Sequence, residues 1–249
     1  MKRILFSLLL VCVGFSQASV AQTADEIVAN YFENIGGKDA WSNLKGIKMS
    51  AKVNQGGMEI PLEIFQMADG RQLTKISLQG NVIKQGVYDG TSVWNTNFQT
   101  MKAEKVDEEA AERFKQESSD FPDALYNYKA KGYTLELVGK ETIEGTETFK
   151  LKLTKKPLKF SGEMVDNINF YYMDSENFVP ILIESEIKEG PQKGAVAQTK
   201  FSEYQEVSGL YFPFSMEQGI KGVGMQAIII EAIELNPTIA DAEFAFPTE

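Results

Sequence analysis

Residues 148–154 read Thr-Phe-Lys-Leu-Lys-Leu-Thr, a strict alternation of polar and apolar side chains. Successive side chains of a β-strand point to opposite faces of a sheet, so this pattern predicts a strand with one face on a core and the other in water. The same period of two recurs at residues 59–64, 167–172 and 179–188. Strands that are half buried in this way are typical of antiparallel sheets. The sequence therefore predicts a mainly β protein with an antiparallel sheet.

Turn-forming residue pairs separate the expected strands. Asp-Gly, Glu-Gly and Ser-Gly pairs favour the tight turns of hairpins, and they occur at residues 69–70, 89–90, 144–145 and 208–209. Alternation between such turns predicts about eleven strands without an internal repeat. Residues 228–230 are three consecutive isoleucines, so both faces of that strand are apolar. One face of this strand can line the interior of a barrel while the other packs against a helix.

Two regions have the periodicity of helices. Residues 24–35 begin with a capping-box sequence and carry their apolar side chains on one helical face, and a short turn follows at 38–44. Residues 107–116 are rich in Glu, Ala and Lys, and Pro122 can open a further short helix through Tyr128. Many strands with few helices predict one strongly curved sheet, with helices across one opening.

The first 21 residues have the parts of a secretory signal peptide. Lys2 and Arg3 precede an apolar stretch of 12 residues, and the small residues Ser19 and Ala21 fit a cleavage site. The apolar stretch is shorter than the ~20 residues that span a bilayer. We expect residues 1–21 to be removed and the mature chain to be periplasmic. No shift in composition marks a boundary after that point, so we expect a single domain over residues 22–249.

The residue types that are missing limit the chemistry of this chain. It contains no histidine, and its one cysteine, Cys12, lies in the expected signal peptide. Nucleophile pairs and metal sites that use histidine or cysteine are therefore excluded from the mature chain. We predict no catalytic residue, no metal and no cofactor. Paired carboxylates can catalyse glycoside hydrolysis, so a carboxylate-dependent hydrolase is a competing hypothesis.

The net charge argues against partners that are polyanions. Without Lys2 and Arg3 the chain has 23 basic and 35 acidic residues, a net charge of −12. An acidic chain is repelled by nucleic acid and by anionic lipid head groups. We therefore expect no nucleic-acid partner, and the acidic surface is consistent with a soluble protein.

Three stretches resemble the LolA/LolB-like family of outer-membrane lipoprotein-sorting proteins. Residues 88–94 (Tyr-Asp-Gly-Thr-Ser-Val-Trp) are similar to a family hairpin in which an Asp-Gly turn is followed by a Trp. Residues 121–126 (Phe-Pro-Asp-Ala-Leu-Tyr) are similar to a short Pro-led helix after the first half of the family's sheet. Residues 244–247 (Phe-Ala-Phe-Pro) are similar to its aromatic-Pro ending. The order of the expected elements also matches over nearly the whole mature chain.

This resemblance implies a half-open antiparallel β-barrel with a helical lid over an apolar cavity. It implies a carrier of lipoprotein acyl chains, or of another lipid, that works with lipoprotein-handling proteins of the inner and outer membranes, and we expect a monomer. In the family an Arg-Pro pair before the third strand holds the lid closed. Here Arg71 lies slightly later and has no Pro after it. Arg71 is therefore either a lid latch or an exposed residue after a turn, and the longer insert at 107–128 is a second departure.

A barrel that binds acyl chains needs an interior lined by apolar and adaptable side chains. We take the candidates from the more apolar face of each expected strand, adding Phe65 because its neighbour strand lacks an aromatic residue. The predicted cavity residues are Phe65, Trp94, Phe149, Leu151, Phe170, Tyr172, Ile183, Phe212, Phe214 and Ile229. A filled core would show the same residues, so the sequence leaves open whether the interior is a cavity or a core.

Two questions remain open at this point. A periplasmic module that senses lipid or binds a protein, without transport, would use the same fold. The helices at 24–35 and 107–128 either gate the mouth of the barrel or plug it permanently.

Overall fold

The computed structural model describes residues 22–247 of this protein. The expected signal peptide at residues 1–21 lies outside the described residues. Within the described range the chain forms fifteen strands, three α-helices and one short 3-10 helix, η1 (Asp241–Glu243). None of the described helices is long and apolar enough to cross a membrane.

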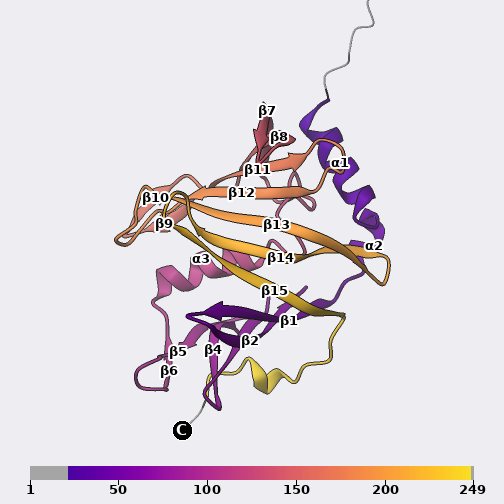
Figure 1. The fold of residues 1–249 in the computed structure, drawn as a ribbon. Coiled ribbons are helices and arrows are strands. Elements are labelled where there is room, and N and C mark those ends of the chain that lie inside the picture. The colour runs from indigo at the N-terminus through magenta and orange to yellow at the C-terminus, as the bar shows by residue number, and fades with distance from the viewer. Residues whose placement is uncertain (1–21, 248–249) are drawn as a thin grey trace, which may run out of the picture.

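Thirteen strands form one antiparallel sheet, shown in Figure 1. From one edge to the other they are β6 (Ala103–Lys105), β5 (Val93–Thr96), β4 (Asn81–Tyr88), β3 (Gln72–Leu78), β2 (Met58–Met67), β1 (Gly46–Gln55), β15 (Gly224–Leu235), β14 (Leu210–Ile220), β13 (Val196–Val207), β12 (Pro180–Glu186), β11 (Ile168–Asp174), β8 (Thr146–Thr154) and β7 (Thr134–Ile143). A separate hairpin consists of β9 (Leu158–Phe160) and β10 (Glu163–Val165).

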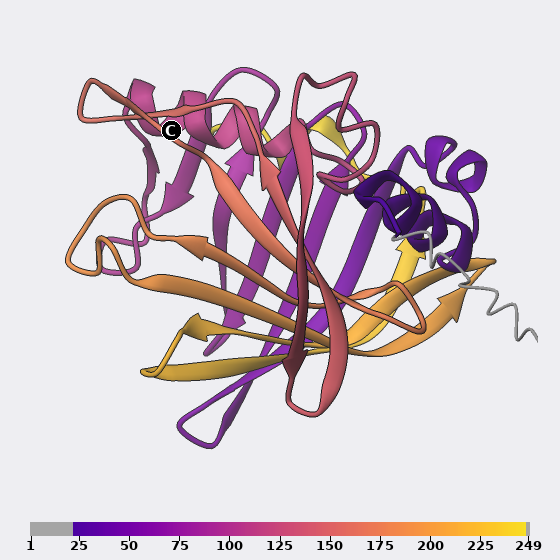
Figure 2. The same cartoon turned by 90° about the horizontal axis from the view of Figure 1, so that it is seen from above.

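The sheet is open, because its edge strands β6 and β7 do not pair with each other in the described part of the chain. The two halves of the sheet join at its centre, where β1 pairs with β15 and Ile47 lies opposite Leu235. Figure 2 shows that the sheet curls strongly. The prediction of a mainly β, half-open antiparallel barrel is confirmed. The sheet has more strands than the expected eleven, since β5 and β6 span only four and three residues, too few for alternation to be recognised.

The connection between the two edges carries the helical insert. β6 and β7 follow each other in the sequence, so residues 106–133 must cross from one edge of the curled sheet to the other. This connection contains α3 (Glu108–Ser118), which Figure 2 shows lying over the opening of the sheet. Asp107 caps α3 by accepting a hydrogen bond from the backbone N–H of Ala110 at 2.8 Å.

The expected short helix from Pro122 to Tyr128 is wrong, because residues 124–130 form turns and residues 122–123 belong to no helix. The side chain of Asp123 accepts a hydrogen bond from the backbone N–H of Leu125 at 2.6 Å, which closes a local turn in place of a helical one. Asn127 then adopts φ of 51°, in the left-handed region, where a right-handed helix cannot continue.

The helix α1 (Ala24–Asn34) begins where the capping box predicts. The Thr23 hydroxyl accepts from the backbone N–H of Glu26 at 3.2 Å, and the Glu26 carboxylate accepts from the backbone N–H of Thr23 at 2.8 Å. Gly36 ends the helix with φ of 112°, and a Cβ there would collide with the carbonyl oxygen of Gly209. The short helix α2 (Lys38–Ser42) follows and buries Trp41.

Two separate apolar cores hold the sheet. The main core packs α1 and residues 121–133 on β7, β8, β11, β14 and β1, with Phe32, Leu125 and Leu151 fully buried. The second core packs the C-terminal segment, residues 236–247, on β2 to β5. There the indole N–H of Trp94 donates to the carbonyl oxygen of Phe244 at 3.0 Å. The second core therefore holds the C-terminal segment against one half of the sheet.

Candidate functional site

A cavity of about 520 Å³ lies on the face of the sheet that carries α1. The strands β1, β2 and β3 line it from one half of the sheet, and β12 to β15 line it from the other. Tyr31 of α1, Trp41 of α2 and residues 122–123 of the connection complete the wall. We call this space the main cavity. It lies at the place where the two halves of the sheet meet.

The register of the strands explains why the wall of the main cavity is apolar. Met49 of β1 lies opposite Ile64 of β2, so both side chains share the face that lines the cavity. On the other half of the sheet Ile183, Met216 and Ile228 line the same space. Among the described residues that line the cavity none is Lys or Arg, and Asp123 is its one carboxylate.

Two of the ten predicted cavity residues line the main cavity, namely Ile183 and Phe212. Phe149 and Leu151 lie in the main core, against which Phe214 packs while partly buried. These five residues therefore share one face of the sheet with α1, but three of them fill a core rather than face the open space.

The structure does not bring the other five predicted residues into the main cavity. Phe65 and Trp94 lie in the second core. On β11 and its neighbour, the Lys150 ammonium lies over the rings of Phe170 and Tyr172, at 5.2 and 5.1 Å from their centroids. Ile229 is 39% exposed, whereas its neighbour Ile228 lines the cavity.

These placements have one physical reason. A shift of one residue moves every side chain of a strand to the other face of the sheet. Where both faces of a strand are apolar, as at residues 64–65, 170–173 and 228–230, the alternation does not identify the face that looks inward.

Arg71 holds the C-terminal segment. Its guanidinium lies 2.7 Å from an oxygen of Asp241 and 2.8 Å from an oxygen of Asp69, and it stacks over the ring of Phe244 at 4.9 Å. These contacts connect the turn between β2 and β3 to residues 236–247. The role of Arg71 as a lid latch stays a prediction.

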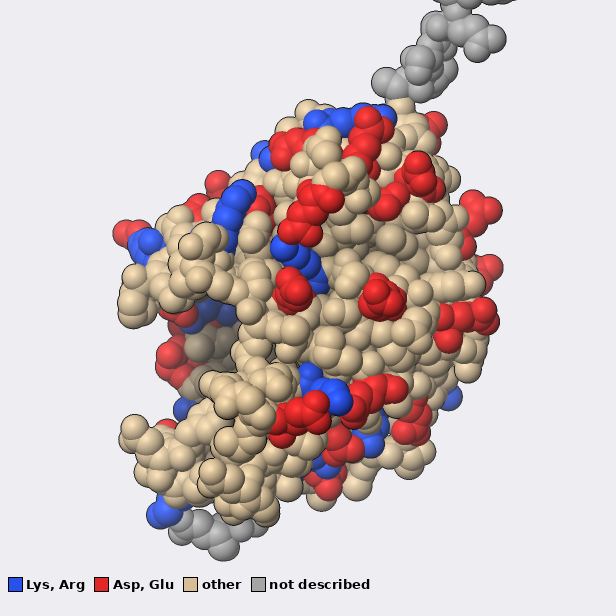
Figure 3. Space-filling view, viewed as in Figure 1, with Lys and Arg blue, Asp and Glu red and all other residues tan. Residues whose placement is uncertain are grey.

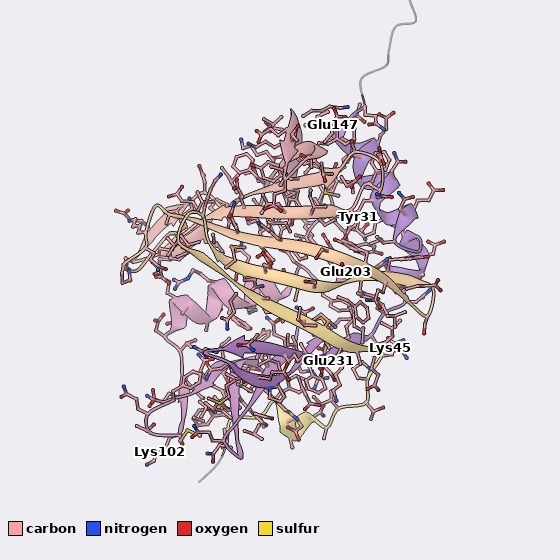
Figure 4. All side chains as sticks on the ribbon, viewed as in Figure 1. Tyr31, Lys45, Lys102, Glu147, Glu203 and Glu231 are labelled. Atoms are coloured by element: carbon pink, nitrogen blue, oxygen red, sulfur yellow. The ribbon has the colours of Figure 1, made fainter. Side chains whose placement is uncertain are left out.

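The polar part of the main cavity includes Gln66, Thr74 and Gln218 and a hydrogen-bonded pair that the sequence did not reveal. The hydroxyl of Tyr31 donates to Oδ2 of Asp123 at 3.0 Å. Tyr31, labelled in Figure 4, lies near the end of β12, and Pro180 of that strand also lines the cavity. The two partners are 92 residues apart in the sequence, so no local pattern could connect them.

Burial controls the protonation of these groups. Asp123 is recessed among protein atoms, and this burial raises the pKa of its carboxyl group above the ordinary value, although hydrogen bonds from Leu125 and Tyr31 oppose the shift. Burial, and then the charge of Asp123, raise the pKa of Tyr31 and of Tyr204. Both phenols are therefore neutral hydrogen-bond donors at physiological pH. Within residues 22–247 no group of acidic side chains is arranged to hold a metal ion.

Comparisons with known proteins identify the fold. No protein-family model matches the sequence, and no curated protein matches it. The chain is similar to a solved domain from Vibrio parahaemolyticus that is described as an outer membrane lipoprotein-sorting protein domain, with 12% identity and a TM-score of 0.54 over 88% of this chain and 94% of that one.

Two further solved structures agree. A LolA superfamily protein from Nitrosomonas europaea matches with 12% identity and a TM-score of 0.53 over 90% of this chain and 98% of that one. A DUF1329 family protein from Desulfovibrio piger matches with 13% identity and a TM-score of 0.53 over 88% and 97% of the two chains. At such low identity the likeness concerns the fold. The resemblance to LolA-like proteins is confirmed at that level.

Proposed function

We propose that this protein is a periplasmic carrier that binds the acyl chains of lipoproteins, or of another lipid, in the main cavity and delivers them to the outer membrane. The observation that carries the proposal is an unfilled cavity of about 520 Å³ with a largely apolar wall. Ligand sites in proteins typically enclose about 300–1,000 Å³ and have such walls. Each buried methylene of an acyl chain contributes about 0.8 kcal/mol to binding.

The fold and the chemistry support a carrier rather than an enzyme. Two of the similar solved structures are described by lipoprotein sorting or by the LolA superfamily. The chain has no histidine, and its only cysteine lies in the expected signal peptide. The expected signal peptide also supports export. Likeness of fold alone does not fix a function, so the proposal depends on the cavity.

The exposed apolar side chains support delivery to a membrane. Antiparallel neighbours place the turns β1–β2, β3–β4, β5–β6, β12–β13 and β14–β15 at one end of the sheet. The hairpin β9–β10, which connects β8 to β11, lies at the same end. Six of the nine exposed large apolar residues of the described chain lie at this end, which we call the apolar end: Met58, Val82, Phe98, Met101, Met164 and Val223. Figure 1 shows the β9–β10 and β14–β15 turns projecting at the left, and the projecting lobes in Figure 3 are mainly uncharged.

Basic residues accompany these side chains. Lys102 and Lys193 are exposed on two turns of the apolar end, and Figure 4 labels Lys102 at the lower left. Lys221, on a third turn, is paired with Glu184 at 2.9 Å. The acidic Glu189 of the same end is paired with Arg113 at 2.9 Å. We propose that this end contacts the lipid surface, because exposed apolar side chains with lysines beside them suit the boundary of a bilayer.

Native mass spectrometry of the protein isolated from a periplasmic extract tests the proposed function. We expect a co-purified lipid or acylated peptide that a neutral fluorescent acyl ester displaces. If the protein is empty and binds no acyl ester, the carrier function is wrong, and a module that senses or interacts without transport is the better reading. A bound polar sugar would instead favour the hydrolase.

A further inference from the structure

We propose that the main cavity selects lipids that carry an ammonium group beside their chains, with Asp123 as the residue that receives this group. The inference rests on the proposed lipid-binding function and adds the chemical class of the ligand's polar part. It starts from the charge of the cavity wall, where a carboxylate is present and Lys and Arg are absent among the described lining residues.

The position of Asp123 suits a ligand's polar group. Asp123 lines both the main cavity and a neighbouring cavity of about 220 Å³, so it lies where the apolar space ends and a more polar one begins. The neighbouring cavity is lined by polar and charged residues, including Glu117, Asp120 and Arg71. The guanidinium of Arg71 is already paired with Asp69 and Asp241. A lipid with its chains in the main cavity would place its polar end beside Asp123.

The carboxylate of Asp123 has free acceptor capacity. Its Oδ1 accepts one hydrogen bond, from the backbone N–H of Leu125 at 2.6 Å, and its Oδ2 accepts one, from Tyr31 at 3.0 Å. Each carboxylate oxygen can accept two hydrogen bonds, so both oxygens can take a further donor. An ammonium group offers such donors and a compensating charge.

The surrounding charged groups leave Asp123 without a counterion. The ammonium of Lys131 is directed to the backbone carbonyl oxygen of Asp123 at 3.2 Å and to the carboxylate of Asp120 at 3.3 Å. Asp120 also pairs with Lys155 at 2.7 Å. No ion pair to the Asp123 carboxylate occurs among the contacts of residues 22–247. The charge of Lys131 still lowers the pKa of the Asp123 carboxyl and that of Asp120 raises it, while the phenols of Tyr31 and Tyr204 stay neutral.

Two consequences follow for the ligand. A recessed carboxylate without a counterion gains from an added cation, because a buried charge is costly unless it is paired. The same carboxylate repels a carboxylate or phosphate that approaches it. Hydrogen bonds to charged groups contribute about 1.5–3 kcal/mol, which corresponds to roughly 10- to 100-fold in affinity.

A structural role for Asp123 is the competing reading, since its two hydrogen bonds also fix the turn and α1. The variant Asp123→Asn removes the charge while the amide oxygen can still accept. The variant Tyr31→Phe removes one hydrogen bond and keeps the charge. If Asp123 recognises the charge of the ligand, only Asp123→Asn changes that recognition. If Asp123 only fixes the local structure, either variant disturbs the local structure.

The test compares dodecylamine, dodecanol and dodecanoate as displacing ligands for a neutral fluorescent acyl ester, at neutral pH and low salt. In the native protein we expect dodecylamine to bind at least about tenfold more tightly than dodecanol, and dodecanoate to bind more weakly than dodecanol. Asp123→Asn should remove this order, and Tyr31→Phe should keep it.

The failures of the two proposals are distinguishable. If the native protein binds dodecanol but binds the amine no more tightly, the ammonium site is wrong and lipid binding stands. If it binds none of the three compounds, the carrier function is wrong. An amine preference that persists in folded Asp123→Asn also overturns the role of Asp123.

Matched natural ligands then separate two sources of an ammonium group. A diacylated lipopeptide with a free amino terminus should lose affinity on N-acetylation if the protein receives an acylated peptide. A phospholipid with an ethanolamine head group should bind more tightly than one with a glycerol head group if it receives an aminolipid. Absence of both differences contradicts the proposal.

Discussion

Ile228 and Ile229 are adjacent residues of β15 that face opposite sides of the sheet, so they form a matched pair for testing the main cavity. Ile228 lines the cavity, and Ile229 is 39% exposed on the other face. We predict that Ile228→Glu abolishes high-affinity binding of an acyl ligand, whereas Ile229→Glu leaves it unchanged.

The expected magnitude follows from what the bound chain would cover. In Ile228→Glu an acyl chain would have to cover a carboxylate, and removing a polar group from water without a partner costs about 2 kcal/mol or more. Lost apolar contact adds about 0.8 kcal/mol per methylene. Together these correspond to at least roughly a 100-fold loss of affinity. At position 229 the new carboxylate stays in water and lies opposite Lys52 in the register, so its effect should stay within about 0.5 kcal/mol.

The assay is the equilibrium titration of a neutral fluorescent acyl ester, with circular dichroism and thermal unfolding of both variants as controls for folding. Ile228→Trp is a second variant that fills the cavity without adding charge, and it should also weaken binding. Equal affinities of folded Ile228→Glu and Ile229→Glu would show that the main cavity is not the binding site.

Three further predictions concern stability and membrane contact. Phe244→Ala should lower the free energy of unfolding in urea by about 3–5 kcal/mol, because the side chain of Phe244 is fully buried in the second core. Phe98→Ala, at a side chain that is 58% exposed, should change it little. Val223→Glu should reduce co-sedimentation with zwitterionic lipid vesicles without loss of acyl-ester binding. Val138→Glu, at an exposed residue away from the apolar end, is its control; equal sedimentation of both would contradict the membrane-facing role. Burial alone would raise the pKa of Glu184, but hydrogen bonds from Lys221, Gln198 and Tyr172 outweigh it and lower the pKa, so the stability that Glu184 contributes at neutral pH should be lost as the pH falls below the ordinary value of about 4.3. Unfolding of Glu184→Gln should show a weaker loss of stability on acidification, and an identical pH profile would contradict the assignment.

The strands and helices could be predicted from the sequence more accurately than the contacts between side chains. The alternation at 148–154 and the capping box at Thr23 are local signals, and both describe the structure correctly. The second core depends on Trp94 and Phe244, which are 150 residues apart, and no periodicity connects them. The turns at 122–128 depend on the side chain of Asp123, a residue type that competes with helix formation by bonding to nearby backbone.

The face of each strand was the hardest property to infer. At β11, Tyr171 and Met173 pack in the main core, while the alternating pattern favoured Phe170 and Tyr172. Both sets are apolar, so only the neighbouring strands decide the register. Asp123 could not be recognised from the sequence for a different reason. A single acidic residue among apolar ones does not indicate a site by itself, and only the fold places Tyr31 beside it.

The two long helices differ in how firmly they are held, and this decides which of them can act as a lid. α1 buries Ile27, Val28, Tyr31 and Phe32 in the main core. At about 1.5–3 kcal/mol for each buried side chain, its detachment would cost roughly 6 kcal/mol or more, which is comparable to the whole stability of a typical protein of about 5–15 kcal/mol. α1 should therefore stay in place when a ligand enters.

α3 is held by weaker contacts. None of its residues is buried. Gln116 donates to the backbone carbonyl oxygen of Lys156 at 2.7 Å, Arg113 pairs with Glu189 at 2.9 Å, and the ring of Phe114 meets that of Tyr88 edge-on at 6.1 Å. Exposed ion pairs contribute about 0–1 kcal/mol each, so α3 can detach at small cost.

We therefore predict that α3, and not α1, is the moving part of the lid. Hydrogen exchange followed by mass spectrometry should show fast exchange of the α3 amides and slow exchange of the α1 amides, because local opening costs least where few apolar contacts are buried. A bound acyl ligand should change the exchange of α3 and leave that of α1 unchanged, since a ligand shifts only an equilibrium in which it binds the two states differently. If α3 exchanges as slowly as α1 and does not respond to the ligand, both helices are permanent parts of the wall, and chains must enter the cavity by another route.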